Sequence, residues 1–178
     1  MPNSTVITLI VVAVVGVIAG IVAYYVMRFM KGSIKLLLTQ TGFEPGQAIT
    51  GSFDLQVKKT IQSKKLIVSL IGTQITETYE DGKKRTRTRE IYRNEVLIED
   101  AREYPAGHTA QHQFEISTPN TKSSEFMNSA LGQTVTAALR LLSDRRTRLK
   151  WKVEARLDTK GVDLAASKSV SINMPQMG

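Results

Sequence analysis

Two histidines four residues apart, His108 and His112, form the arrangement in this chain that comes nearest to a metal site. The surrounding residues predict a turn and the start of a strand, where side chains four positions apart lie about 13 Å from each other on one face. That separation is too long for both imidazoles to bind one ion. No acidic third ligand follows nearby in the sequence, so we expect no metal site and no cofactor.

Groups for catalysis are also sparse. The chain has no cysteine, no Gly-x-Ser-x-Gly nucleophile elbow and no Gly-rich phosphate loop. Paired carboxylates can act as acid and base, but Glu99, Asp100 and Glu103 flank a Tyr-Pro turn among basic residues, as surface charges do. Asp158 and Asp163 bracket another turn, with too few oxygen ligands for calcium. We therefore expect a protein that is not an enzyme.

An uncharged apolar run covers residues 6–27. A helix of this length measures roughly 33 Å, enough to cross a hydrocarbon core of about 30 Å. A secretory signal peptide is the alternative, but it would have a basic start and a small-residue cleavage site, which are missing here. The sequence predicts a five-residue head at 1–5, a transmembrane helix at 6–30, a short linker at 31–33 and a β domain at 34–178.

The residues that flank this run predict its orientation. Arg28 and Lys31 follow the span, as does Lys35, and positive charge stays on the cytoplasmic side. We expect a single-pass protein of the cell membrane (inner, plasma or intracytoplasmic), with the N-terminus outside and the β domain in the cytoplasm. Tyr24 and Tyr25 suit the headgroup belt. The absence of cysteine agrees with a cytoplasmic domain.

Small residues within the span form a pattern for helix packing. Gly16 and Gly20 make a Gly-x-x-x-Gly pair, and Ala13 and Ala23 lie on nearby turns. Small residues let two helix backbones approach closely in lipid. The pattern predicts contact with the helices of integral membrane subunits or with a second copy of the chain; the alternative is the ordinary abundance of Gly and Ala in membrane helices.

The net charge is +8, and the basic residues gather in two places. The residues that we expect to form a basic partner or lipid surface are Lys83, Lys84, Arg85, Arg87, Arg145, Arg146 and Arg148. Near a membrane, each exposed Lys or Arg contributes about 1 kcal/mol to binding of anionic lipid. A solvated hairpin and loop is the other interpretation. Nucleic acid is not favoured as a partner, because no stacking aromatic residues interleave these runs.

Most of the β domain follows the period-2 pattern of half-buried strands. The Asp81-Gly82 pair is typical of a hairpin, here between strands at 73–79 and 85–92. Trp151 alternates with Lys150 and Lys152, which predicts a core ring. The other expected strands lie at 34–39, 49–57, 65–72, 94–99, 112–117, 148–157 and 167–174. About eight short strands separated by turns indicate an antiparallel, immunoglobulin-like β-sandwich.

One segment, residues 123–142, has helical spacing instead. Its apolar face carries Met127, Leu131, Val135, Ala138 and Leu142, with polar residues on the other face. The sequence predicts an amphipathic helix inserted into the sandwich. Its apolar face either packs on the sandwich or docks on a membrane surface or another subunit.

The order of several motifs resembles the arrestin-like family, a superfamily that includes arrestins, the related retromer subunit and bacterial sporulation-control proteins. These motifs are Phe43-x-Pro45-Gly46, the strand at 65–72 that ends in Gly72, Tyr104-Pro105-Ala106-Gly107, Phe114, Pro119, and Trp151 with Ala155. The resemblance covers residues 34–174 and implies a sandwich for protein binding without catalysis. Family members usually have two sandwiches in tandem and no membrane anchor, whereas this chain has room for one sandwich and carries an anchor.

The favoured hypothesis is an accessory or scaffold subunit of a larger membrane complex, for example an energy-converting or photosynthetic assembly, whose sandwich bridges or stabilises neighbouring subunits. The alternative is a membrane-tethered arrestin-like adaptor that recruits soluble partners. A membrane-bound enzyme is the least favoured hypothesis, because no residue points to a reaction.

Overall fold

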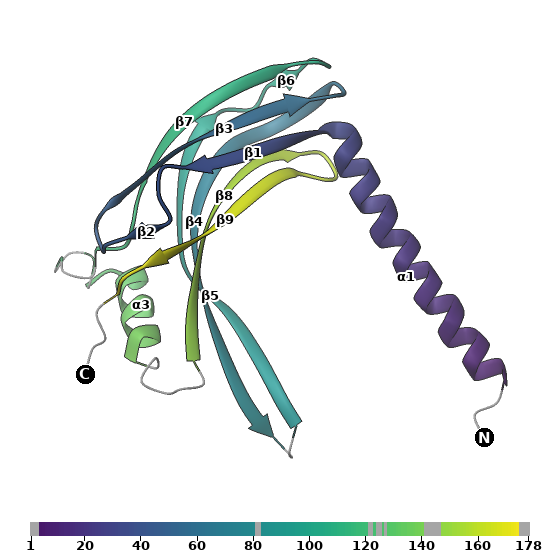
Figure 1. Cartoon of the computed structure of the whole chain (residues 1–178), viewed down its shortest axis with the longest axis horizontal. Coiled ribbons are helices and arrows are strands. Elements are labelled where there is room, and N and C mark those ends of the chain that lie inside the picture. Colours follow the sequence, from purple (N-terminus) through teal and green to yellow (C-terminus); the bar gives the residue numbers. More distant parts are fainter. Residues whose placement is uncertain are drawn as a thin grey trace.

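The computed structural model describes residues 4–80, 83–120, 123, 126, 128–140 and 147–174. It has one long N-terminal helix, α1 (Ser4–Lys31), followed by two packed sheets and a short helix, α3 (Ala130–Arg140). Figure 1 shows α1 standing clear of the sandwich, with its N-terminus far from the sheets. Since the remaining elements are mostly antiparallel strands, the predicted fold class is confirmed.

The helix α1 is apolar on every side, and every side chain from Val6 to Val26 is exposed. One span, Val6–Lys31, is long and apolar enough to cross a membrane, as judged by length and composition. The helix ends at Lys31, and the first strand, β1 (Gly32–Leu38), begins at the next residue. The separate linker expected at residues 31–33 was therefore wrong.

The smaller sheet has three antiparallel strands in the order β1-β3-β7, with β3 at Ala48–Val57 and β7 at Thr109–Ser117. Its inner face carries Ile34 and Leu36 of β1, Phe53 of β3 and Phe114 of β7, all buried. The alternation predicted for residues 49–57 is confirmed, because Ile49, Phe53, Leu55 and Val57 are all buried.

The larger sheet has the order β2-β9-β8-β4-β5. Its strands are β2 (Gly42–Phe43), β9 (Leu164–Ile172), β8 (Thr147–Thr159), β4 (Ile61–Glu80) and β5 (Lys83–Glu99), and the short β6 (Glu103–Tyr104) pairs with β4. The β2–β9 pair is parallel and all the others are antiparallel. The two sheets enclose a single apolar core.

Two long strands replace four of the predicted short ones. β4 runs unbroken over 20 residues and β5 over 17, although separate strands were expected on either side of Gly72 and of Arg93. The distal parts of these strands, residues 73–80 and 83–90, form a hairpin that projects beyond the sandwich, and we call it the arm (Figure 1). The predicted hairpin pairing is confirmed, with Glu80 opposite Lys83.

The arm begins at a bulge beside the tryptophan. Gly72 pairs with Tyr92 and Thr73 pairs with Glu90, so Ile91 is an extra residue on β5. Such a bulge bends the strands and increases their twist. On the other side of β4, Gly72 lies opposite Trp151. Trp151 is only 4% exposed, which confirms the prediction of a core ring.

The short helix α3 lies within the expected segment and packs on the sandwich. Val135 and Ala138 are buried in the core, whereas Leu131 is 47% exposed. Phe126, ahead of α3, contacts Tyr92 with ring centroids 6.3 Å apart. The helix therefore uses part of its apolar face for packing; Met127 and Leu142 lie outside the described residues.

Gly72 has no room for a side chain, because a Cβ there would lie 2.5 Å from Cζ3 of Trp151. We expect Gly72→Ala to lower the free energy of unfolding by about 1–3 kcal/mol, the usual cost of overpacking a core. Chemical denaturation followed by fluorescence measures this directly, since Trp151 is the one tryptophan in the chain.

Gly42→Ala is the matched control, because a Cβ at Gly42 meets nothing within 4 Å. A change within about 0.5 kcal/mol is expected there. Equal losses for the two variants would contradict the packing of Trp151 on Gly72.

Candidate functional site

The junction between α1 and the sandwich is held by one lysine. The Lys31 ammonium donates hydrogen bonds to Thr159 Oγ1 (3.0 Å), to the Lys160 carbonyl (3.0 Å) and to the Val162 carbonyl (2.9 Å). Thr159 is the last residue of β8, and Lys160 and Val162 lie in the turn between β8 and β9. Asp163 Oδ1 accepts a hydrogen bond from the Thr159 amide at 3.0 Å, which orders this turn. The last residue of α1 is thus bound to a segment that lies 128 to 131 residues later in the sequence.

Backbone and ring contacts complete this junction, which we call the α1 joint. The Lys58 amide donates to the Lys31 carbonyl at 2.8 Å, and the Lys58 ammonium lies 3.4 Å from the centroid of the Phe29 ring. Gly32 has φ of 150°, and a Cβ there would lie 2.1 Å from the Gln56 carbonyl oxygen. Only glycine fits such a close approach at positive φ. The joint leaves no flexible tether between helix and sheet.

The predicted membrane-interface residues have different surroundings in the structure. Tyr24 and Tyr25 are exposed and lie edge to face, with ring centroids 5.7 Å apart. Lys31 is not a free interfacial charge, because its ammonium is bound within the sandwich. The side chain of Arg28 lies outside the described residues. Gly16 and Gly20 have no atom within 4 Å of their Cβ positions, so that side of α1 is open for the predicted helix packing.

One face of the arm is rich in arginine. Arg85, Arg87 and Arg89 alternate along β5, and their direct partners on β4 are Thr78, Thr76 and Gln74. Directly opposed residues share a face of the sheet, so these three guanidinium groups lie opposite uncharged polar side chains. All residues from Lys83 to Glu90 are exposed. We call these three residues the arginine face.

On the other face of the arm, the two basic runs of the sequence meet. Glu77 forms ion pairs with Lys84 at 2.7 Å and with Arg148 at 3.1 Å. The hydrogen bond from Lys84 holds the pKa of the Glu77 carboxyl below its ordinary value, and the charge of Arg148 acts in the same direction. The structure therefore brings Lys84 and Arg148 together, while Arg145 and Arg146 lie outside the described residues.

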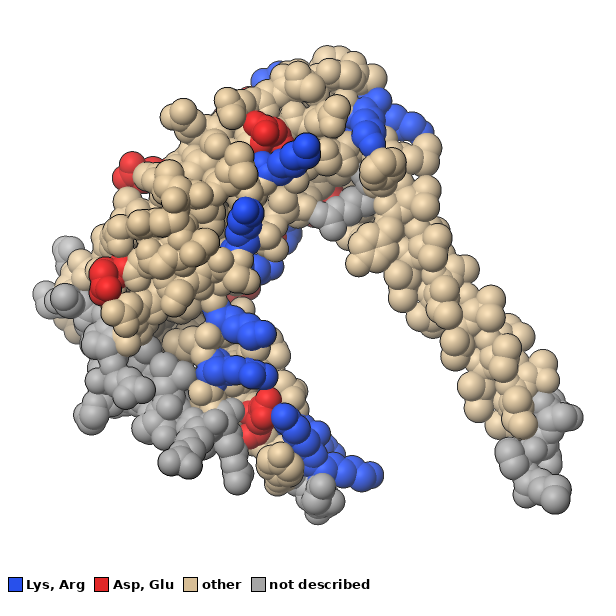
Figure 2. Space-filling model, in the orientation of Figure 1, with Lys and Arg blue, Asp and Glu red and all other residues tan. Residues whose placement is uncertain are grey.

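Basic side chains continue from the arm along β8. Arg148, Lys150 and Lys152 alternate on its outer face, and with Lys84 we call them the basic stripe. Figure 2 shows Lys and Arg side chains along the side of the large sheet that borders the hollow between the arm and α1. Both α1 and the arm leave the sandwich toward this same side (Figure 1). The sequence did not predict this shared direction.

Glu154 neutralises the upper part of the basic stripe. It accepts hydrogen bonds from Lys152 at 2.6 Å and from Arg156 at 2.5 Å. Burial raises the pKa of the Glu154 carboxyl, but these two cations outweigh burial and hold the pKa below its ordinary value of 4.5. Lys150 has no such partner among the described residues, so positive charge remains toward the arm.

A polar cluster that the sequence did not predict lies around Glu99, where the end of β5 comes near β7 of the small sheet. Glu99 of β5 accepts hydrogen bonds from Tyr104 Oη and lies 3.3 Å from Arg102 and 3.8 Å from Nε2 of His112. Burial, with the bond to Glu99, raises the pKa of the Tyr104 hydroxyl. Within the described part of the chain, no three His, Asp or Glu residues lie close enough to hold a metal ion.

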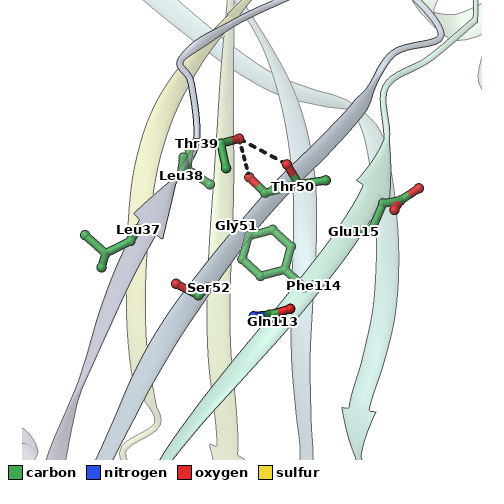
Figure 3. A pocket seen from close by; sticks show the side chains of 9 residues that line it. All are labelled: Leu37, Leu38, Thr39, Thr50, Gly51, Ser52, Gln113, Phe114 and Glu115. Atoms are coloured by element: carbon green, nitrogen blue, oxygen red, sulfur yellow. Dashed lines mark hydrogen bonds between the residues drawn. The ribbon is translucent and has the colours of Figure 1, made fainter.

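A shallow groove of about 600 Å³ lies along the small sheet, lined by residues of β1, β3 and β7. Figure 3 shows its lining, in which Gly51 and Phe114 lie between Leu37 on one side and Glu115 on the other. Thr39 Oγ1 donates to the Thr50 carbonyl at its rim, at 3.0 Å. Its polar lining consists of the Glu115 carboxylate, the Gln113 amide and the hydroxyls of Thr39, Thr50 and Ser52.

Comparison with known proteins identifies the fold alone. No family model and no curated protein sequence matches the chain. Its structure is similar to the crystal structure of Spo0M, a sporulation control protein from Bacillus subtilis, with a TM-score of 0.55 and 12% sequence identity. The match covers 82% of this chain and 50% of that one, so the chain spans about half the length of Spo0M. This likeness and the sandwich topology together confirm the predicted arrestin-like fold.

The bonds of Lys31 give the first prediction from this site. We expect Lys31→Met to lower the free energy of unfolding by about 1–2 kcal/mol, because three charge-assisted hydrogen bonds are lost at a half-buried position. Denaturation of the full chain in detergent measures the loss. Lys35→Met is the control, since Lys35 is exposed on the next strand, and an equal effect there would argue against the joint.

The ion pairs of Glu154 make the free energy of unfolding depend on pH. A carboxylate whose pKa is lowered by folding stabilises the protein above its unfolded pKa, and this contribution disappears as the pH falls through the folded value. We expect Glu154→Gln to cost about 1 kcal/mol at pH 7, with the difference from the native chain shrinking below pH 4.5. Urea denaturation over a pH series measures it. Glu115→Gln, at an exposed position of β7, is the control. If the difference in free energy of unfolding between Glu154→Gln and the native chain stayed constant with pH, Glu154 would not be the group that titrates.

Proposed function

We propose that this protein is a non-catalytic, single-pass scaffold or accessory subunit of a larger membrane complex. α1 anchors the chain in the bilayer with the N-terminus outside, and the sandwich lies in the cytoplasm against neighbouring subunits. Excess Lys and Arg after the span supports this orientation. The open side of α1 at Gly16 and Gly20 supports packing against other transmembrane helices.

The α1 joint is the observation that carries the proposal. Lys31 is bound to the β8–β9 turn, Phe29 to Lys58, and Gly32 to the backbone of β3. A protein that captures diffusing partners gains reach from a flexible tether. A subunit that bridges fixed neighbours needs the opposite property, namely a set position relative to the membrane. The short and bonded connection favours the second role.

The arm supplies the surface for contact in this proposal. Because charged side chains are costly in hydrocarbon, its Lys and Arg residues meet lipid headgroups or the polar surface of a partner. The arginine face gives the arm positive charge on one side, and the basic stripe continues along β8 next to its other side. Anionic lipid and acidic protein surfaces are the matching chemistries.

Membrane extraction under mild conditions tests the proposal. We expect the native chain to migrate with a large complex in fixed stoichiometry, as seen by size separation and mass spectrometry. Replacing Arg85, Arg87 and Arg89 together by Gln should reduce the amount that migrates with the complex, because three positive contacts of the arm are removed.

The control is the triple variant with Gln at Lys35, Lys59 and Lys168, which removes the same charge from exposed positions away from the arm. It should migrate as the native chain does. A native chain that travels alone at the size of a monomer or dimer would contradict the scaffold role and favour the membrane-tethered adaptor.

A further inference from the structure

The first four residues of β8 have a neighbouring strand on only one side. β4 pairs with β8 as far as Thr147, which lies opposite Thr76. β9 pairs with β8 only from Leu157 to Trp151, the last pair being Trp151 with Val170. Among the residues that the structure describes, no strand pairs with the second edge of residues 147–150, which we call the open segment.

Beyond this point the end of β9 is bonded to β2 on its other edge. The Ser171 amide donates to the Thr41 carbonyl at 2.7 Å, and the Asn173 amide donates to the Phe43 carbonyl at 2.9 Å. The Met174 amide then turns back to the Ile172 carbonyl at 2.9 Å. A hollow of about 640 Å³ remains between the end of β9 and the open segment, lined by residues 147–151 and 169–174.

Backbone groups of the open segment point into this hollow. Along a strand, successive residues direct their N–H and C=O groups to opposite edges. The backbone N–H groups of Ser171 and Asn173 point to β2, so the backbone groups of Val170 point to β8. The backbone groups of its partner Trp151 therefore point to β9. The same alternation directs the backbone groups of Leu149 and Thr147 into the hollow. Such an unpaired edge is a template for an added strand.

The side chains around the open segment define what could be added. Arg148 and Lys150 are exposed on the outer face, and Lys150 has no ion pair with a described residue. Leu149 and Trp151 lie on the inner face, beside the apolar core. Since directly opposed residues share a face, a strand that enters here places an apolar side chain opposite Leu149 and acidic side chains opposite Arg148 and Lys150.

We propose that the open segment binds an extended acidic segment of a partner protein, which adds to the large sheet as an antiparallel strand beside β8. The preferred sequence alternates acidic, apolar and acidic residues. This site goes beyond the scaffold role, since it names the kind of peptide that binds and the strand edge that binds it. Binding can be tested on the purified chain without any membrane complex.

The probe is a short fluorescent peptide that alternates Glu and Val, added to the full chain in detergent. The valine amides of the bound peptide face Leu149 and the glutamate amides face away, so N-methylation distinguishes the two edges. We expect the peptide to bind, the version methylated at its glutamate amides to bind as well, and the version methylated at its valine amides to fail. Equal binding of both methylated peptides would overturn the proposal, because it would indicate attraction by charge alone.

Two measurements on the protein side complete the test. Lys150→Glu should weaken binding by roughly three- to ten-fold, whereas Lys59→Glu, at an exposed position in the β3–β4 turn, should leave it unchanged. Hydrogen exchange at the Leu149 amide should be fast in the free chain and slow with the peptide. A Leu149 amide that is already protected in the free chain, or that peptide leaves unprotected, would contradict the open segment as the binding site.

Discussion

Three oxygen atoms, one from the last residue of β8 and two from the β8–β9 turn, accept hydrogen bonds from the ammonium group of Lys31, and this contact sets the direction in which α1 leaves the sandwich. A helix joined to a sheet by one peptide bond could swing about that bond if nothing else held it. Here Lys31 ties the end of α1 to a turn 128 residues or more along the chain. The Phe29–Lys58 contact holds the preceding turn of the helix to the loop after β3.

Two long strands connect the α1 joint to the arm. β8 begins beside the arm at Thr147 and ends at the turn that binds Lys31, so one strand connects the two features. β4 runs beside it from the sandwich core into the arm, with the bulge at Gly72 and Trp151 between them. Packed cores transmit displacement because they have little free volume. Helix, sandwich and arm therefore behave as one body in our account.

Sequence patterns predicted the features that depend on local residues. The alternation around Trp151 predicted a ring in the core, and the spacing of Val135 and Ala138 predicted an amphipathic helix, whose packing on the sandwich only the structure decided. The same patterns divided β4 and β5 into shorter strands. The expected break in β4, after Gly72, falls at the register shift where the extra Ile91 of β5 interrupts the regular alternation while the backbone pairing continues.

Contacts between residues far apart in the sequence could not be predicted from local patterns. Lys31 follows an apolar run and has the sequence context of an interfacial charge, while its acceptors lie beyond residue 158. Lys84 and Arg148 belong to separate basic runs, and only the pairing of β4 with both β5 and β8 brings them to Glu77. The open segment of β8 depends on where the pairing of β9 with β8 ends, at Trp151 and Val170.

The distance between α1 and the arm in a lipid bilayer shows whether the helix is held at a fixed angle to the sandwich. The chain has no cysteine, so Val12→Cys on α1 and Thr88→Cys on the arm place two spin labels without interference. We expect a single narrow distance distribution for this pair, which broadens when Lys31→Met is added. A broad distribution with Lys31 in place would show that helix and sandwich move independently and would contradict a scaffold of fixed geometry.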